Sequence, residues 1–253
     1  MTRNGKTHRG RGDGRGDGLV GQPSRRVRGG WQVHRIDESE APIGPDVRTP
    51  DFADVLAAIE GAPRGDDWPA IRELVIPIIP RVRALPAGYP DPLRRLVPPG
   101  ILVGVGIDLG PAIATIAAHQ CEVLGIGESE LIAQSLVNLV ARAEEVPAAA
   151  VLRDDVDGVP VAALQTGRSI GSTLVLAPDQ LRRLFGPEPA LYVAPMRDLL
   201  LGLPADVGLE LASWLYSEFA GQDPNHLPPT GFRFDGERVT TASLGGPAAS
   251  LPA

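Results

Sequence analysis

Residues 101–116 read ILVGVGIDLGPAIATI. The first seven residues form a short run rich in β-branched side chains, which predicts a buried strand. The next four residues, 108–111, have the composition of a turn, and residues 112–116 can pair back on the first strand. The stretch therefore predicts an antiparallel hairpin in the core of the fold.

The wider segment 96–118 is the most apolar part of the chain and contains one charged residue, Asp108. Three prolines and four glycines interrupt it. A membrane-spanning helix is not interrupted so densely, so buried strands are the better interpretation. We expect no membrane association.

Two amphipathic helices are predicted downstream of this hairpin. In residues 128–145 the apolar face contains Leu139 and Val140, while Asn138 lies on the polar flank. In residues 206–220 Trp214 shares the apolar face with Leu215, which predicts that Trp214 is a core residue.

Three further pairs of short apolar runs are typical of strand pairs. They are residues 149–152 with 159–164, 191–194 with 199–201, and 232–234 with 238–240. The expected fold is α+β: a single domain over residues 50–242, with a mostly antiparallel sheet packed against the two helices. Residues 243–253 are rich in Gly, Pro and Ala and are expected to form a flexible tail.

The charge is distributed unevenly along the 253 residues. Residues 1–35 hold nine basic and two acidic side chains, and the rest of the chain holds 15 basic and 29 acidic ones. Residues 1–48 are rich in Gly and Arg and poor in large apolar side chains, so we expect a disordered basic arm. The acidic remainder makes nucleic-acid binding by the folded domain unfavourable.

Cysteine usage and the N-terminal sequence point to a cytoplasmic protein. The single cysteine, Cys121, excludes an internal disulfide framework and a multi-cysteine zinc site. No apolar segment follows the Arg25-Arg26 pair, as an export signal would require. The four histidines lie apart without metal-ligand spacing, so neither a metal nor another cofactor is expected.

The segment 106–110, Gly-Ile-Asp-Leu-Gly, resembles the first phosphate loop of the actin-like ATPases and sugar kinases. In that superfamily the glycines let backbone amides approach a phosphate. Here Pro111 follows directly and removes one amide donor, and only 143 residues remain after Gly110. A hairpin turn is the better interpretation, and no catalytic residue is assigned.

The most suggestive polar feature is Arg197-Asp198, which lies between two apolar segments. Adjacent residues of a strand point to opposite faces, so each side chain needs a separate partner or a ligand. We favour a buried ion-pair or turn network over a ligand site.

Three features, in this order, resemble the YtpQ-like family of uncharacterised bacterial proteins. They are an apolar strand ending in Asp108, a Glu130-Leu131 to Asn138-Leu139 helix, and Pro-x-Arg-Asp-Leu-Leu at residues 195–200. The similarity covers residues 66–241 and implies a compact cytosolic α+β domain without a known activity. It singles out Asn138, Arg197 and Asp198 as candidate binding residues.

Three functions are compatible with these observations. The first is a non-enzymatic binding or scaffold protein with a protein or small-molecule partner. The second is a hydrolase or nucleotide-dependent enzyme that uses Asp108, Arg197 and Asp198, which requires the three side chains to meet in one concave pocket. The third is an RNA-associated protein that acts through the basic arm, although residues 1–30 lack interleaved aromatic side chains.

Overall fold

The computed structural model describes residues 57–58, 60–62, 67–81, 91–98, 100–110, 112–223 and 226–244. The predicted arm, residues 1–48, lies outside these ranges, and so does the predicted tail from residue 245 onward. Ser243 still belongs to a strand and Leu244 is buried, so the fold extends past residue 242.

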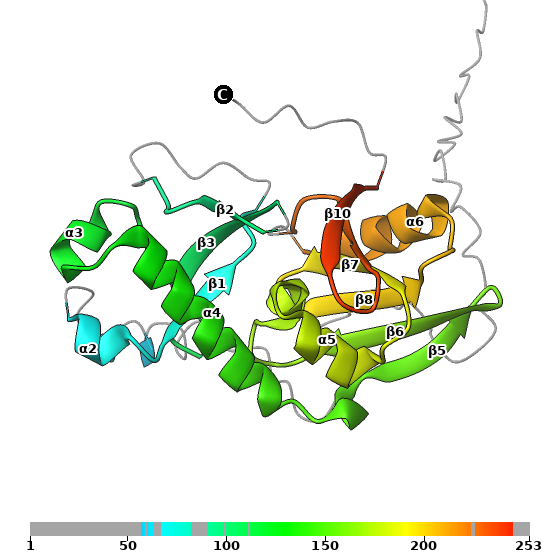
Figure 1. The fold of residues 1–253 in the computed structure, drawn as a ribbon, viewed down its shortest axis with the longest axis horizontal. Helices are drawn as coiled ribbons and strands as arrows, with labels where there is room; N and C mark the ends of the chain where they lie inside the picture. Colours follow the sequence, from blue (N-terminus) through cyan, green and yellow to red (C-terminus); the bar gives the residue numbers. More distant parts are fainter. Residues whose placement is uncertain are drawn as a thin grey trace, which may run out of the picture.

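Helices and strands alternate irregularly along the chain (Figure 1). In chain order, the elements of the described residues are α2 (Trp68–Ile71), β1 (Val75–Ile78), β2 (Arg95–Val97), β3 (Ile101–Asp108), β4 (Ile113–Thr115), α3 (Gln120–Leu124), α4 (Glu128–Glu144), η1 (Ala148–Ala150), β5 (Leu152–Val156), β6 (Val159–Gln165), η2 (Gly171–Leu176), α5 (Pro178–Phe185), β7 (Ala190–Met196), β8 (Leu199–Pro204), α6 (Leu209–Ala220), β9 (Thr230–Phe234) and β10 (Val239–Ser243). The α+β prediction is confirmed.

The strands of the described residues form two sheets, in which every pairing is antiparallel. The first sheet has the order β1-β3-β2, with β4 also paired to β3, and the second has the order β10-β9-β7-β8-β6-β5. The predicted hairpin is β3 with β4, and the predicted pairs 191–194 with 199–201 and 232–234 with 238–240 are β7–β8 and β9–β10. The predicted strand 149–152 is misplaced: Ala148–Ala150 form η1, and the strand that pairs with β6 is β5, Leu152–Val156.

Gly106 lets strand β4 pack closely against strand β3. A Cβ atom there would collide with Ile113 of the neighbouring strand β4. The glycine thus permits the close packing of the hairpin, while Val103 and Val105 supply buried side chains.

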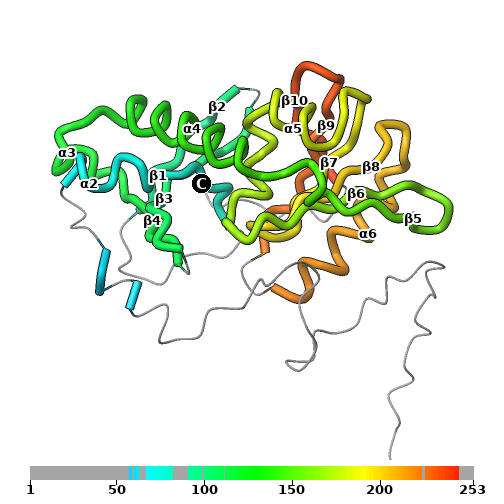
Figure 2. Tube along the Cα trace, turned by 90° about the horizontal axis from the view of Figure 1, so that it is seen from below, coloured from blue at the N-terminus to red at the C-terminus, as the bar shows by residue number. Residues whose placement is uncertain are grey.

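The second sheet is covered by helices on both faces (Figure 2). Successive residues of β7 alternate: Tyr192 belongs to the core shared with α5 and η2, and Val193 belongs to the core shared with α6. This alternation follows from the period of two in a strand. Because both faces of this sheet are covered, the side chains on either face of β7 and β8 are buried. These two strands are therefore apolar almost throughout.

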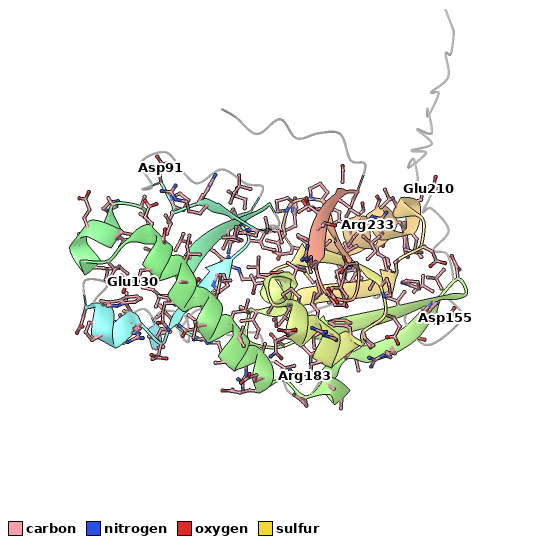
Figure 3. The ribbon with its side chains drawn as sticks, in the orientation of Figure 1. Asp91, Glu130, Asp155, Arg183, Glu210 and Arg233 are labelled. Atoms are coloured by element: carbon pink, nitrogen blue, oxygen red, sulfur yellow. The ribbon has the colours of Figure 1, made fainter. Side chains whose placement is uncertain are left out.

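Helix α4 joins the two sheets. Its N-terminal half packs on the first sheet through Leu131 and Ile132. Its C-terminal half, with Leu139 and Ala143, lies in the same core as residues of both sheets. Arg183 of α5 donates hydrogen bonds of 2.6 Å to the Ala143 carbonyl and 3.0 Å to the Val146 carbonyl, beside the end of α4 (Figure 3).

Both predicted amphipathic helices are present, but their buried faces differ from the prediction. In α4, Asn138 is 5% exposed and Val140 is 39% exposed, the reverse of the expected order. In α6, Trp214 is 36% exposed, so its prediction as a core residue is wrong. The reason is that α6 approaches the sheet through the small side chain of Ala212 together with Leu215, which turns Trp214 toward the edge of the contact.

Candidate functional site

Asp198 lies in the two-residue turn between β7 and β8, and its carboxylate binds the loop that precedes η2. Asp198 Oδ2 accepts a hydrogen bond of 2.6 Å from the Gly167 amide, and Oδ1 accepts one of 3.2 Å from the Gly171 amide. The Thr166 hydroxyl also donates to Oδ1. Burial raises the pKa of Asp198, and these hydrogen bonds lower it without cancelling the effect of burial.

Backbone contacts fix the same loop against the turn. The Ser172 amide donates a hydrogen bond of 3.0 Å to the Arg197 carbonyl. A Cβ atom at Gly171 would lie 2.8 Å from the carbonyl carbon and oxygen of Asp198, so only glycine fits this approach. The carboxylate therefore has a structural role: it satisfies amides at the start of a helical segment.

Arg197 has different surroundings, although it is the next residue in the chain. Among the residues that the structure describes, none forms a hydrogen bond or an ion pair with its guanidinium. The side chain is half-buried. Burial is the main cause that lowers the pKa of Arg197 to about 10; the charge of Arg81 lowers it further, and the charge of Asp223 raises it.

The position of Arg197 follows from an irregularity at the end of β7. The register between β7 and β8 shifts between Val193 and Met196. At this point the Pro195 carbonyl accepts a hydrogen bond of 3.0 Å from the Leu227 amide. The segment after α6, which includes Asp223, is thereby held next to the turn, while Arg81 comes from the stretch that follows β1.

Asn138, the third candidate binding residue, has all its hydrogen-bonding groups occupied within the chain. Its Nδ2 donates hydrogen bonds of 2.8 Å to the carbonyls of Arg72 and Val75. Its Oδ1 accepts a hydrogen bond of 2.8 Å from Gln134. These contacts join α4 to the start of β1, which gives Asn138 a structural role.

Asp108 lies at the end of β3 and forms an ion pair with Arg142 of α4. Its Oδ1 also accepts a hydrogen bond of 2.8 Å from the Gly110 amide. The glycine amide that a phosphate loop would offer to its ligand is therefore used by Asp108 itself. This contact supports the interpretation of the segment as a hairpin turn.

A hollow of about 330 Å³ opens next to this ion pair, and its lining residues are Asp108, Gly110, Arg142, Glu145, Gly167 and Arg168. Two of these lining residues, Arg168 and Glu145, form a second ion pair. Neither Arg197 nor Asp198 lines this hollow. Asp198 accepts a hydrogen bond from the amide of Gly167, and Gly167 is a lining residue. Asp108, Arg197 and Asp198 thus do not meet there as the enzyme hypothesis requires.

Sequence reasoning missed the partners of these residues. Thr166, Gly167 and Gly171 hold Asp198, and Arg81 and Asp223 act on Arg197. Each is distant in sequence from the turn at residues 197–198, so no local pattern connects them. The only signal was Thr166-Gly167 at the end of the predicted strand 159–164, which is turn composition.

The described part of the chain shows neither a metal-binding cluster nor a membrane-spanning helix. No group of three or more His, Cys, Asp or Glu side chains there is arranged to hold a metal ion. No helix within the described ranges is long and apolar enough to cross a membrane.

No family model, curated protein or solved structure matched the chain. The resemblance to the YtpQ-like family therefore stays a prediction.

Proposed function

We propose that this protein is a non-enzymatic binding protein that contacts its ligand through Arg197. The observation that carries this proposal is the half-buried guanidinium without a hydrogen bond or an ion pair to any described residue. A guanidinium has five N–H donors, and removing it partly from water without a partner costs free energy. A ligand that accepts these hydrogen bonds would recover that cost.

The contrast with Asp198 supports the same proposal. The two residues share one turn, but three donors satisfy the Asp198 carboxylate. The turn is thus held in place without any help from the Arg197 side chain. A rigid turn that presents an unused guanidinium is the arrangement expected of a preorganised binding residue.

The wider setting of the proposal rests on the sequence. A YtpQ-like relationship would make this a bacterial cytoplasmic protein, and a single cysteine, which is buried, suits a reducing compartment. Association with RNA through the basic arm is a separate hypothesis, since residues 1–48 lie outside the described ranges.

Native mass spectrometry of the protein purified from cells tests the proposal. Wild type is expected to carry a bound mass that denaturation releases, and Arg197→Met is expected to lack it. A matched control is Arg233→Met, which removes an exposed arginine from the same sheet. Equal loading of the two variants, or no bound mass in wild type, would count against Arg197 as the contact residue.

A further inference from the structure

Strand β10 is an outer strand of the six-stranded sheet, and among the described residues β9 is its neighbour on one side alone. At the turn between the two strands, the Asp235 amide donates a hydrogen bond of 3.1 Å to the Arg238 carbonyl. Hydrogen-bonded and non-hydrogen-bonded pairs alternate along an antiparallel ladder, so the next residue whose backbone faces β9 is Thr240. The amides and carbonyls of Val239 and Thr241 therefore point toward the open edge of the sheet.

The other outer strands carry features that hinder pairing with a second chain. At the opposite edge of the same sheet, β5 has three charged residues at 153–155. In the first sheet, β2 is three residues long, and the Val75 carbonyl of β1 accepts a hydrogen bond of 2.8 Å from Asn138 of α4. Strand β10, in contrast, reads Val-Thr-Thr-Ala-Ser and has neither a charge nor a proline. It thus has the composition of a strand that can pair with another chain.

We propose that β10 pairs with β10 of a second copy of this chain, antiparallel about a two-fold axis at Thr240, so that two six-stranded sheets become one. With this axis, the outward backbone groups of Val239 lie opposite those of Thr241 in the other copy. Each of these two pairs can form two hydrogen bonds. Thr240 then lies opposite its own counterpart in a closely spaced pair, a position at which two threonines interact favourably.

The alternative axis at Thr241 fits less well. It would place Val239 opposite Ser243, and Ser243 already takes part in another interaction. The axis at Thr240 forms its central hydrogen bonds through Val239 and Thr241 alone. Because each copy contributes the same strand, the interface is self-complementary, as a two-fold axis requires.

The surroundings of β10 leave room for a second strand. The side chains of Thr240 and Thr241 are both exposed. Helix α6 lies beside the end of the strand, where the Ser213 hydroxyl donates a hydrogen bond to the Leu244 carbonyl. Leu209 is one turn earlier on the same side of α6 and is 37% exposed, which adds apolar surface next to this edge. The contact between two five-residue strands is smaller than a standard interface, so we expect a weak dimer that depends on concentration.

Sedimentation velocity of the full chain over a concentration series tests the inference. Wild type is expected to shift from monomer to dimer as the concentration rises. Thr240→Lys and Thr240→Glu, each confirmed as folded by circular dichroism, are expected to stay monomeric, because two like charges would face each other across the axis. An equimolar mixture of the two variants is expected to dimerise again, because opposite charges then meet. Ser129→Lys and Ser129→Glu, at an exposed position of α4, are the controls and should dimerise like wild type.

Amide hydrogen exchange of wild type gives a second measurement that needs no variant. The amides of Val239 and Thr241 should exchange more slowly at high than at low protein concentration, because dimerisation pairs them. A wild type that is monomeric throughout the series, with exchange independent of concentration, would overturn the inference. Thr240 variants that dimerise like wild type would place the interface elsewhere, and a mixture that stays monomeric would reject the two-fold axis at Thr240.

Discussion

The Oδ2 atom of Asp198 accepts a hydrogen bond of 2.6 Å from the backbone amide of Gly167, 31 positions earlier in the chain. This contact fastens the loop before η2 to the turn between β7 and β8. Because the same loop contributes Gly167 and Arg168 to the hollow beside Asp108, the contact also links the turn to that hollow. Asp198 thereby serves the fold, whereas no described residue forms a hydrogen bond with the guanidinium of the neighbouring Arg197.

Asp198→Asn is expected to destabilise the protein despite its similar shape. The new side-chain NH2 group would face the Gly167 amide, and two donors cannot bond to each other. An unsatisfied buried polar group costs about 1–3 kcal/mol. Urea unfolding measures the loss, with Asp179→Asn, at an exposed position, as the control. Equal stability of the two variants would show that the carboxylate is not needed by the loop.

The pH dependence of stability should carry the signature of Asp198. Burial raises the pKa of its carboxyl group above the ordinary value of 3.8. The folded chain then binds this proton more tightly than the unfolded chain, so the free energy of unfolding falls as the pH rises through the raised value. Asp198→Asn lacks this titration. The stability advantage of wild type over the variant should shrink as the pH rises above 3.8; an advantage that grows would mean that the hydrogen bonds outweigh burial.

Asn138→Asp should be more harmful than Asn138→Ala. The aspartate would place an acceptor against the carbonyl oxygens of Arg72 and Val75, which now accept hydrogen bonds of 2.8 Å from Asn138. The alanine variant leaves these carbonyls unpaired, at about 1–3 kcal/mol. Ser129→Ala, at an exposed position of the same helix, is the control. If both Asn138 variants unfold like the control, Asn138 has no structural role.

The orientation of α6 gives a third pair of variants. Leu215 is 5% exposed and Trp214 is 36% exposed. Leu215→Ala should therefore cost about 2–5 kcal/mol, and Trp214→Ala should cost clearly less, although its side chain is larger. Chemical unfolding of the two variants measures the loss in free energy of unfolding that each substitution causes. A larger loss for Trp214→Ala would restore the orientation that the sequence suggested.

The sequence predicted most of the hairpins because their signals are local. The pair β5 with β6 is the exception: the charged residues 153–155 of β5 look like part of a connection, so the strand was expected at 149–152. The turn of this pair is Asp157-Gly158, and both residues have positive φ angles. The grouping of strands into two sheets was not predictable in this way. It depends on contacts between distant segments, such as those through which α4 joins both cores.

The faces of the helices were predicted less well, for a physical reason. Periodicity treats Asn138 as a polar residue that faces water, but two backbone carbonyls of the neighbouring segment satisfy it in a buried position. The candidate residues Arg197 and Asp198 were found from their apolar flanks. Their opposite roles could not be found, because the donors to Asp198 lie about thirty positions away.

Thermal unfolding of Arg197→Ala beside Asp198→Ala, without added anions, tests the central claim most directly. We predict that Arg197→Ala unfolds at or above the wild-type midpoint, because it removes a half-buried charge that no described residue pairs with. Asp198→Ala should unfold several degrees lower, because it strands the amides of Gly167 and Gly171. A loss in Arg197→Ala as large as that in Asp198→Ala would contradict the account, since the guanidinium would then belong to the fold and not to a ligand site.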